Sequence, residues 1–132
     1  MKDMPVLQPD GLMLDTYLPR EDVRDAFISP HHTGIAELAS GAVVGTSSLR
    51  RRAQVKLRRP DLEVVEFRGN LQTRLKKLDD GVAEATFLAM AGLNRLRMDD
   101  VPQAAVHPDD MLPAIAQGAI GVERRIDDSR AA

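Results

Sequence analysis

The most chemically distinctive stretch of this 132-residue chain is residues 42–52, Ala-Val-Val-Gly-Thr-Ser-Ser-Leu-Arg-Arg-Arg. Thr46, Ser47 and Ser48 are candidate helix N-cap residues, because hydroxyl oxygens accept hydrogen bonds from unpaired backbone N–H groups. Arg50 and Arg51 then fall in the first helical turn, where the partial positive charge of the helix N-terminus disfavours cations. A bound anion would remove this conflict, since backbone N–H groups, hydroxyls and guanidinium forks all bind carboxylates and phosphates.

The same run also has a simpler interpretation, in which the three arginines lie on a solvated helix face. The helix predicted over residues 48–58 would then place Leu49, Ala53 and Leu57, four residues apart, on its apolar stripe. This stretch alone does not separate the two interpretations.

Strand and helix patterns alternate regularly from residue 42 onward. The predicted strands are 42–45, 63–67 and 85–89, and the predicted helices are 48–58, 70–78 and 91–96. This alternation predicts an α/β fold with a parallel sheet and covering helices. In such a sheet the carboxyl ends of the strands meet at one edge, where ligands bind.

Cations follow each of the three predicted strands. Arg50 and Arg51 come after the first strand, Arg68 after the second and Arg95 after the third. The planar fork of arginine binds a carboxylate through two hydrogen bonds. Their convergence on one sheet edge therefore favours a ligand that carries several carboxylates or phosphates.

The second predicted helix separates its basic residues by direction. Its apolar stripe consists of Leu71, Leu75 and Leu78. At about 100° per residue Arg74 borders this stripe, whereas Lys76 and Lys77 point away from it. We expect Arg74 to reach over the sheet edge and the two lysines to be solvated.

The charge of the chain is unevenly distributed. Residues 48–97 hold 12 basic and 6 acidic residues, a net charge of +6, although the whole chain carries −2. A basic centre between acidic flanks indicates an anionic ligand in the centre. Nucleic acid is a weaker alternative, because single strands are usually held by aromatic stacking and the chain has one Tyr, three Phe and no Trp.

The remaining segments carry weaker patterns. Residues 12–18 predict a strand, 34–40 a short helix, 98–110 an acidic loop, and 111–123 a turn that leads into a strand. In residues 20–27, we expect the Arg and Asp side chains to pair with one another on the surface, where such pairs contribute little stability.

Several function classes lack support in the sequence. There is no apolar run of the roughly 20 residues that a membrane span needs, and no apolar signal-peptide core, which favours a cytoplasmic location. The chain has no cysteine and no phosphate-loop or dinucleotide-binding glycine motif. His31 and His32 lack an acidic or cysteine partner at suitable spacing, so we expect no metal site.

Four motifs occur in an order and spacing that match a known family. They are Gly-Thr-Ser-Ser-Leu-Arg-Arg at 45–51, Arg-Gly-Asn-Leu-Gln-Thr-Arg-Leu at 68–75, Ala-Gly-Leu-Asn-Arg at 91–95, and Leu-Pro-Ala-Ile-Ala-Gln-Gly-Ala-Ile-Gly-Val-Glu at 112–123. The chain resembles porphobilinogen deaminase, also called hydroxymethylbilane synthase, and its opening Met-Lys-Asp-Met-Pro-Val resembles the active-site segment of that family.

The resemblance implies a fold and a division of the chain. The fold would resemble one lobe of the type II periplasmic-binding-protein-like fold. Residues 1–17 would be a remnant of the first domain with a hinge strand, and 18–118 the second domain, which binds cofactor and substrate carboxylates. Residues 119–132 would form a second hinge strand that returns into the first domain, and the third domain would be absent.

The resemblance also implies an activity. The family is a transferase of tetrapyrrole and heme biosynthesis that condenses four porphobilinogen molecules into hydroxymethylbilane and releases ammonia. The growing polypyrrole is attached to a dipyrromethane cofactor, which a cysteine absent from this chain would hold. We therefore expect an inactive, monomeric fragment of the enzyme, with no nucleic-acid or membrane partner.

Motif by motif, the resemblance assigns roles to ten residues. Asp3 matches the catalytic aspartate, which stabilises positive charge on pyrrole nitrogens. The positions that match cofactor-binding residues are Lys2, Thr46, Ser48, Arg50 and Arg51. The positions that match substrate-binding residues are Arg68, Arg74, Arg95 and Gln117. The alternative function is a stand-alone α/β module that binds a polyanion or organic acid.

Overall fold

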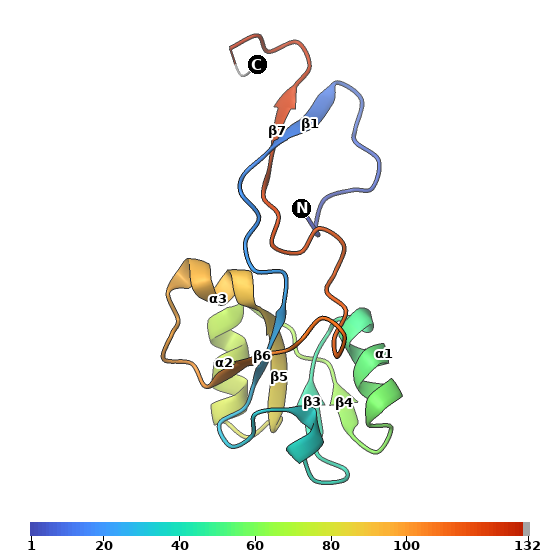
Figure 1. Ribbon diagram of the computed structural model, residues 1–132, viewed down its shortest axis with the longest axis vertical. Coiled ribbons are helices and arrows are strands. Elements are labelled where there is room, and N and C mark those ends of the chain that lie inside the picture. Colours follow the sequence, from blue (N-terminus) through green and yellow to red (C-terminus); the bar gives the residue numbers. More distant parts are fainter. Residues whose placement is uncertain (131–132) are drawn as a thin grey trace.

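The computed structural model describes residues 1–130 and consists of an α/β lobe and a two-stranded ribbon that extends from it (Figure 1). The five-stranded sheet of the lobe has the strand order β4-β3-β5-β2-β6. The ribbon pairs β1 (Leu12–Tyr17) with β7 (Gly121–Arg125) in antiparallel orientation.

The three strands predicted from the regular alternation form the parallel part of the sheet. The central strand β3 (Val43–Gly45) pairs in parallel with β4 (Glu63–Val65) and with β5 (Ala85–Ala89). Three helices follow these strands in turn, namely α1 (Leu49–Arg58), α2 (Leu71–Asp79) and α3 (Met90–Leu96). The predicted strand and helix positions are therefore confirmed to within two residues, and the prediction of an α/β fold is confirmed with them.

The sheet is mixed, because two further strands join the predicted parallel part through antiparallel pairing. The strand β2 (Asp25–Ile28) is antiparallel to β5 and also to β6 (Gln103–Ala105). All four residues of β2 are buried, although the Arg and Asp side chains of residues 20–27 were expected to pair at the surface. The strand β6 lies in the stretch predicted as an acidic loop. A four-residue buried strand shows no alternation, and a three-residue edge strand is held by backbone pairing, so neither produces a sequence period.

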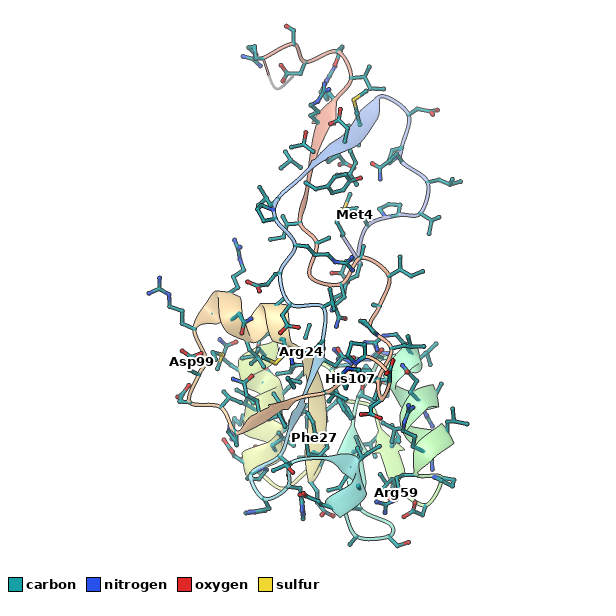
Figure 2. All side chains as sticks on the ribbon, viewed as in Figure 1. Met4, Arg24, Phe27, Arg59, Asp99 and His107 are labelled. Atoms are coloured by element: carbon teal, nitrogen blue, oxygen red, sulfur yellow. The ribbon has the colours of Figure 1, made fainter. Side chains whose placement is uncertain are left out.

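The core lies on both faces of the sheet, because successive strand residues point to opposite sides. On the α1 side, Phe27 of β2 packs against Phe87 of β5, with ring centroids 5.5 Å apart in an edge-on arrangement. On the other side, Ile28 packs in a cluster with Leu78 of α2 and Leu93 of α3. Figure 2 shows Phe27 inside the lobe and Met4 beside the ribbon.

The predicted apolar stripe of α1 was wrong. Leu49 and Leu57 are 81% and 80% exposed, whereas Arg51 and Val55 form the buried face. Both pairs have helical spacing, and an arginine occupies the inner position because it finds a buried carboxylate there. The interpretation of all three arginines as solvated is therefore also wrong for Arg51.

The second helix follows its prediction more closely. Leu78 is buried, and Leu71 and Leu75 pack against the core while partly exposed. Lys76 is exposed, as expected, and pairs with Asp80, the residue that caps the end of its helix. Lys77 was expected to be solvated, but its Nζ lies 5.4 Å from the Phe67 ring centroid.

Shorter elements fit their predictions in part. The helix predicted over 34–40 is only a 3-10 turn, Ile35–Glu37. The strand predicted over 12–18 and the strand predicted within 119–132 pair with each other in the ribbon, with Tyr17 opposite Gly121 and Leu12 opposite Arg125. Within residues 1–130, no helix is long and apolar enough to cross a membrane.

Candidate functional site

The turn between β3 and α1 is shaped by its hydroxyl residues. The Ser48 Oγ accepts a hydrogen bond from the Arg51 backbone N–H at 3.4 Å, which caps α1, and the Thr46 Oγ1 accepts from the Ser48 N–H at 3.2 Å. A side chain at Gly45 would lie 2.5 Å from ring atoms of Phe67. The turn therefore needs a glycine next to its hydroxyls, and Ser48 is confirmed as the N-cap.

A buried carboxylate lies at the centre of the arginine cluster. Asp25 has no exposed surface, and its Oδ1 and Oδ2 lie 2.7 Å from Arg51 Nη2 and Arg50 Nη2, respectively. Arg51 also donates to the Phe87 carbonyl at 2.8 Å, and Arg50 donates to the Leu112 carbonyl. Arg50 and Arg51 are therefore already paired with an anion of the same chain, the Asp25 carboxylate.

Asp25 is the site residue that sequence reasoning missed. The expectation for residues 20–27 holds for Asp22 and Arg24, which form a partly exposed pair at 2.7 Å. The expectation is wrong for Asp25, which pairs with Arg50 and Arg51 of α1 in the interior. The available signal was an aspartate directly before the apolar Ala-Phe-Ile run, since a carboxylate that starts a buried strand needs cationic partners.

Gln117 connects this ion-pair cluster to the turn that precedes β7. Its side chain is buried, and Nε2 donates to Asp25 Oδ1 at 2.9 Å and to the Val23 carbonyl at 2.8 Å. Arg20 Nε in turn donates to the Gln117 carbonyl at 3.1 Å. Gln117 therefore holds the turn against the start of β2.

A cavity of about 510 Å³ opens beside Gln117. Its lining includes Lys2, Asp3, Arg95 and Gln117, four of the residues predicted for the site. The chain start reaches this place because the Met1 amino group donates to the Ala119 carbonyl at 3.1 Å. Figure 1 shows the N-terminus between the ribbon and the lobe, next to the segment that leads into β7.

Positive charge is concentrated at this edge. Loss of solvent contact and the nearby Arg51 charge lower the pKa of Lys2, and the same two causes lower the pKa of Arg74. Burial by itself raises the pKa of Asp25, but Arg51, Arg50 and Gln117 outweigh it and hold that pKa below its usual range. Arg50 and Arg51 thus share the buried Asp25 carboxylate, and Lys2 lies close enough for both arginine charges to act on it. Arg74 Nε donates to the Gly69 carbonyl at 2.9 Å, and this side chain lies near Arg51. The excess of positive charge favours an anionic ligand.

Two predicted residues lie at the margin of this arrangement. Arg68 keeps 78% of its side chain exposed and pairs with Glu66 at 2.9 Å, so no contact joins it to the cluster. Arg95 is exposed on α3 and lines the cavity.

A second cavity, of about 530 Å³, lies on the α1 face of the sheet and is lined by Phe27, Phe87 and Met111. Its Arg59 donates to the carbonyls of Ile35 and Leu38 and pairs with Asp61 at 2.6 Å. Arg58, the other arginine of this lining, donates to the Asp109 carbonyl at 2.6 Å. Because both arginines of this cavity are engaged, the cavity beside Gln117 is the better anion site.

Comparison with protein families gives one match over the whole chain. The model for porphobilinogen deaminase, dipyromethane cofactor binding domain, matches residues 1–132. The chain belongs to the porphobilinogen deaminase family.

Curated relatives carry the same family name. The porphobilinogen deaminase of Paracoccus denitrificans is 71% identical over 132 residues, which is 100% of this chain and 42% of the relative. That of Nitrobacter winogradskyi is 54% identical over 98% of this chain and 41% of the relative. The chloroplastic porphobilinogen deaminase of Oryza sativa is 53% identical over 97% of this chain and 36% of the relative. The chain thus spans less than half the length of these relatives.

Solved structures with low identity share the fold. An arginine-specific periplasmic binding protein of Salmonella typhimurium has a TM-score of 0.54 at 14% identity, over 91% of this chain and 54% of that protein. A probable amino-acid transporter binding protein of Bacillus subtilis has a TM-score of 0.53 at 12% identity, over 92% of this chain and 53% of that protein. The predicted likeness to a periplasmic-binding-protein lobe is therefore confirmed.

The porphobilinogen deaminase domain matched here is the one that binds the dipyrromethane cofactor, as predicted. The residues present fit an acidic group of this kind, because cations outnumber carboxylates around Asp25. In addition, the buried Arg51 Nε has no hydrogen-bond partner within residues 1–130. The chain contains no cysteine, so no residue of it forms a thioether to the cofactor.

Proposed function

We propose that this chain is the part of a porphobilinogen deaminase that holds the carboxylates of the dipyrromethane cofactor and of the growing polypyrrole. The observation that carries the proposal is the pairing of Arg50 and Arg51 with the buried carboxylate of Asp25 at one sheet edge, with Lys2 and Arg74 near enough for the Arg51 charge to act on each. A family match over residues 1–132 supports it. It would bind a pyrrole through its acetate and propionate groups.

Each residue has a role in this proposal. Lys2 and Arg50 bind carboxylates directly, because Lys2 lines the cavity and 24% of the Arg50 side chain is exposed. Arg51 supports them from the interior. Thr46 and Ser48 shape the turn, and backbone N–H groups at the start of α1 add donors.

The other predicted site residues have roles that follow from their positions relative to the cavity beside Gln117. Arg95 and Gln117 line it and position substrate. Arg74 lies outside the lining, near Arg51, and adds positive charge for substrate carboxylates. Arg68, at the exposed margin, meets substrate only as the polypyrrole lengthens. Asp3, also in the lining, places its carboxylate where positive charge on a pyrrole nitrogen is stabilised as ammonia leaves; fixed charge of this kind contributes a few kcal/mol to catalysis, about 3 for one group.

The dipyrromethane supplies, when bound, the pyrrole to which substrate is joined. We propose that a cysteine outside this chain attaches it, and that the 132 residues alone form no hydroxymethylbilane. The division at residues 1–17, 18–118 and 119–132, a monomeric state and a cytoplasmic location belong to the same proposal. The ribbon that joins β1 to β7 supports the division. Analytical ultracentrifugation and cell fractionation test the last two.

The proposal is tested by transplanting the chain into a full-length relative. These 132 residues replace the matching segment of a relative, and porphobilinogen consumption, ammonia release and hydroxymethylbilane formation are measured. We expect an active chimera, and a loss of about 100-fold in kcat for its Asp3→Asn variant, the size typical for one preorganised charge.

The matched control is Asp10→Asn, which removes the same charge from the same N-terminal segment but lies outside the cavity lining. It should retain activity. A correctly folded chimera that binds neither cofactor nor porphobilinogen would contradict the proposal. If a correctly folded chimera instead bound small dicarboxylates tightly without turnover, the organic-acid-binding module would be supported. The only present support for that module is the likeness of the fold to periplasmic binding proteins.

A further inference from the structure

Asp25 is a full charge inside the protein whose contacts all lead to the candidate site. Its two oxygens accept from Arg50 and Arg51 at 2.7 Å each, and Oδ1 also accepts from Gln117 Nε2 at 2.9 Å. Asp25 itself has no exposed surface and does not line the cavity. It therefore acts on a ligand only through its three partners.

The two arginines owe their orientation largely to this carboxylate. Arginine has several rotatable bonds, and fixing such a side chain costs about 1.5–2 kcal/mol of conformational free energy. The remaining contacts of the guanidinium groups are single backbone carbonyls, Leu112 for Arg50 and Phe87 for Arg51. Asp25 alone joins the two groups, one to each oxygen, so their relative geometry depends on it.

We propose that Asp25 is a positioning residue of the anion site, which aligns Arg50 and Arg51 for carboxylate binding and ties them through Gln117 to the cavity. The inference rests on the proposed function, since it concerns the same ligand. It predicts a change in anion affinity on loss of the Asp25 charge that is opposite to the change expected from Coulomb attraction alone. Removing a negative charge should by Coulomb attraction tighten the binding of an anion, whereas loss of alignment should weaken it.

The test measures porphobilinogen binding to the 132-residue chain by calorimetry and by NMR of the arginine side-chain N–H groups. For Asp25→Asn we expect affinity to fall by about tenfold or more, the equivalent of one charge-assisted hydrogen bond. The Arg50 and Arg51 signals should lose their separate, slowly exchanging Nη resonances. The control Asp22→Asn removes the same charge from the exposed pair with Arg24 and should leave both readouts unchanged.

A second pair of variants covers a failure of Asp25→Asn to fold, because that change leaves the buried Arg51 charge unpaired. Arg51→Met is compared with Arg51→Met combined with Asp25→Asn, in which both buried charges are gone. If Asp25 positions Arg50, the double variant binds porphobilinogen more weakly than Arg51→Met, although its net charge is one unit more positive.

The outcomes separate this inference from the proposed function. Equal or tighter porphobilinogen binding by the folded Asp25→Asn variant, or by the double variant relative to Arg51→Met, overturns the positioning role and leaves the carboxylate site in place. An unaltered chain that binds no porphobilinogen overturns the carboxylate site and the positioning role together.

Discussion

Asp25 is the one buried carboxylate among residues 1–130. A carboxylate with no exposed surface is stable as an anion only because two guanidinium groups and an amide satisfy it. Removing one partner of a buried ion pair is far more costly than the pair is stabilising, because the other charge remains buried. The stability of the lobe and the proposed binding of the ligand therefore both depend on the Asp25 side chain.

The first prediction concerns the pH dependence of stability. The partners of Asp25 hold its pKa in the folded state below that in the unfolded state, which is about 3.9. Its stabilising contribution is therefore fully present above that pH and is lost as the pH falls through the folded-state pKa. At pH 7, Asp25→Asn should lower the free energy of unfolding by about 3–5 kcal/mol, as measured by urea denaturation.

The same denaturation series supplies its control. The difference between the unaltered chain and Asp25→Asn should narrow below about pH 4, where the unfolded aspartate takes up a proton. Asp22→Asn, which breaks a partly exposed pair, should cost much less at every pH. A constant difference down to pH 2 would mean that the Asp25 carboxylate is not the source of the effect.

At the scale of elements, α1 shows how a polar contact overrides apolar patterning. Its inner face consists of Arg51 and Val55, while Leu49 and Leu57 face outward. Helical periodicity identifies sets of residues that share a face but not which set is buried. The orientation of α1 follows from the ion pair with Asp25, a residue 26 positions away from Arg51 in the sequence.

This orientation predicts opposite outcomes for two substitutions in α1. Leu57→Gln changes an exposed side chain and should alter the free energy of unfolding by less than about 0.5 kcal/mol. Val55→Ala removes two fully buried methyl groups and should cost about 2 kcal/mol. Thermal denaturation of both variants checks this, and a larger cost for Leu57→Gln would restore the apolar stripe first expected from the sequence.

The turn that carries Gln117 depends on Gly118. Gly118 has a φ of +78°, and a Cβ there would overlap the Glu21 carbonyl oxygen. Gly41 has a φ of +81° with nothing within 4 Å of its would-be Cβ. A side chain would thus strain the backbone at both positions, but it would overlap a neighbouring atom only at position 118.

Alanine at these two glycines separates strain from contact. Gly41→Ala should cost about 1–2 kcal/mol, the cost of a left-handed conformation for a residue with a side chain. Gly118→Ala should cost more and should also weaken porphobilinogen binding, because Glu21 and the turn must move apart and Gln117 moves with the turn. Equal destabilisation and unchanged binding would show that the turn tolerates the shift.

Sequence reasoning succeeded where the pattern was local and failed where the partner was distant. The helices after β3, β4 and β5 lie where the alternation of patterns predicted them, although the apolar stripe predicted for α1 was wrong. The parallel strands place Thr46, Ser48, Arg50 and Arg51 at one edge. The role of Asp25 was not predictable, since it depends on an antiparallel strand whose pairing partners lie about 60 and 80 residues downstream. Among the ten predicted site residues, the structure brings most to the edge or the cavity and leaves Arg68 in the surface pair with Glu66.

At the scale of the whole molecule, the lobe and the ribbon differ in what holds them. The lobe has apolar clusters on both sheet faces, whereas the ribbon pairs only β1 with β7 and leaves Tyr17, Val122 and Ile126 about half exposed. An isolated two-stranded hairpin is at best marginally stable in water. The ribbon should therefore open more often than the lobe.

Native-state hydrogen exchange measures this difference directly. Backbone amides of β1 and β7 should exchange at least about 100-fold faster than those of β3 and β5, since local opening of unsupported strands requires little free energy. The comparison uses amides hydrogen-bonded between strands in both sheets. Equal protection in the ribbon and the lobe would mean that the two unfold as one cooperative unit.

The central claim is that this sheet edge binds the carboxylates of a pyrrole, and it is tested most directly by titrating the chain with porphobilinogen and with unsubstituted pyrrole. The account predicts saturable binding of porphobilinogen alone, with NMR shifts at Lys2, Arg50 and Arg95 and with binding weakened by Arg50→Met. Equal binding of both compounds, or shifts confined to the apolar cavity at Phe27 and Met111, would contradict it.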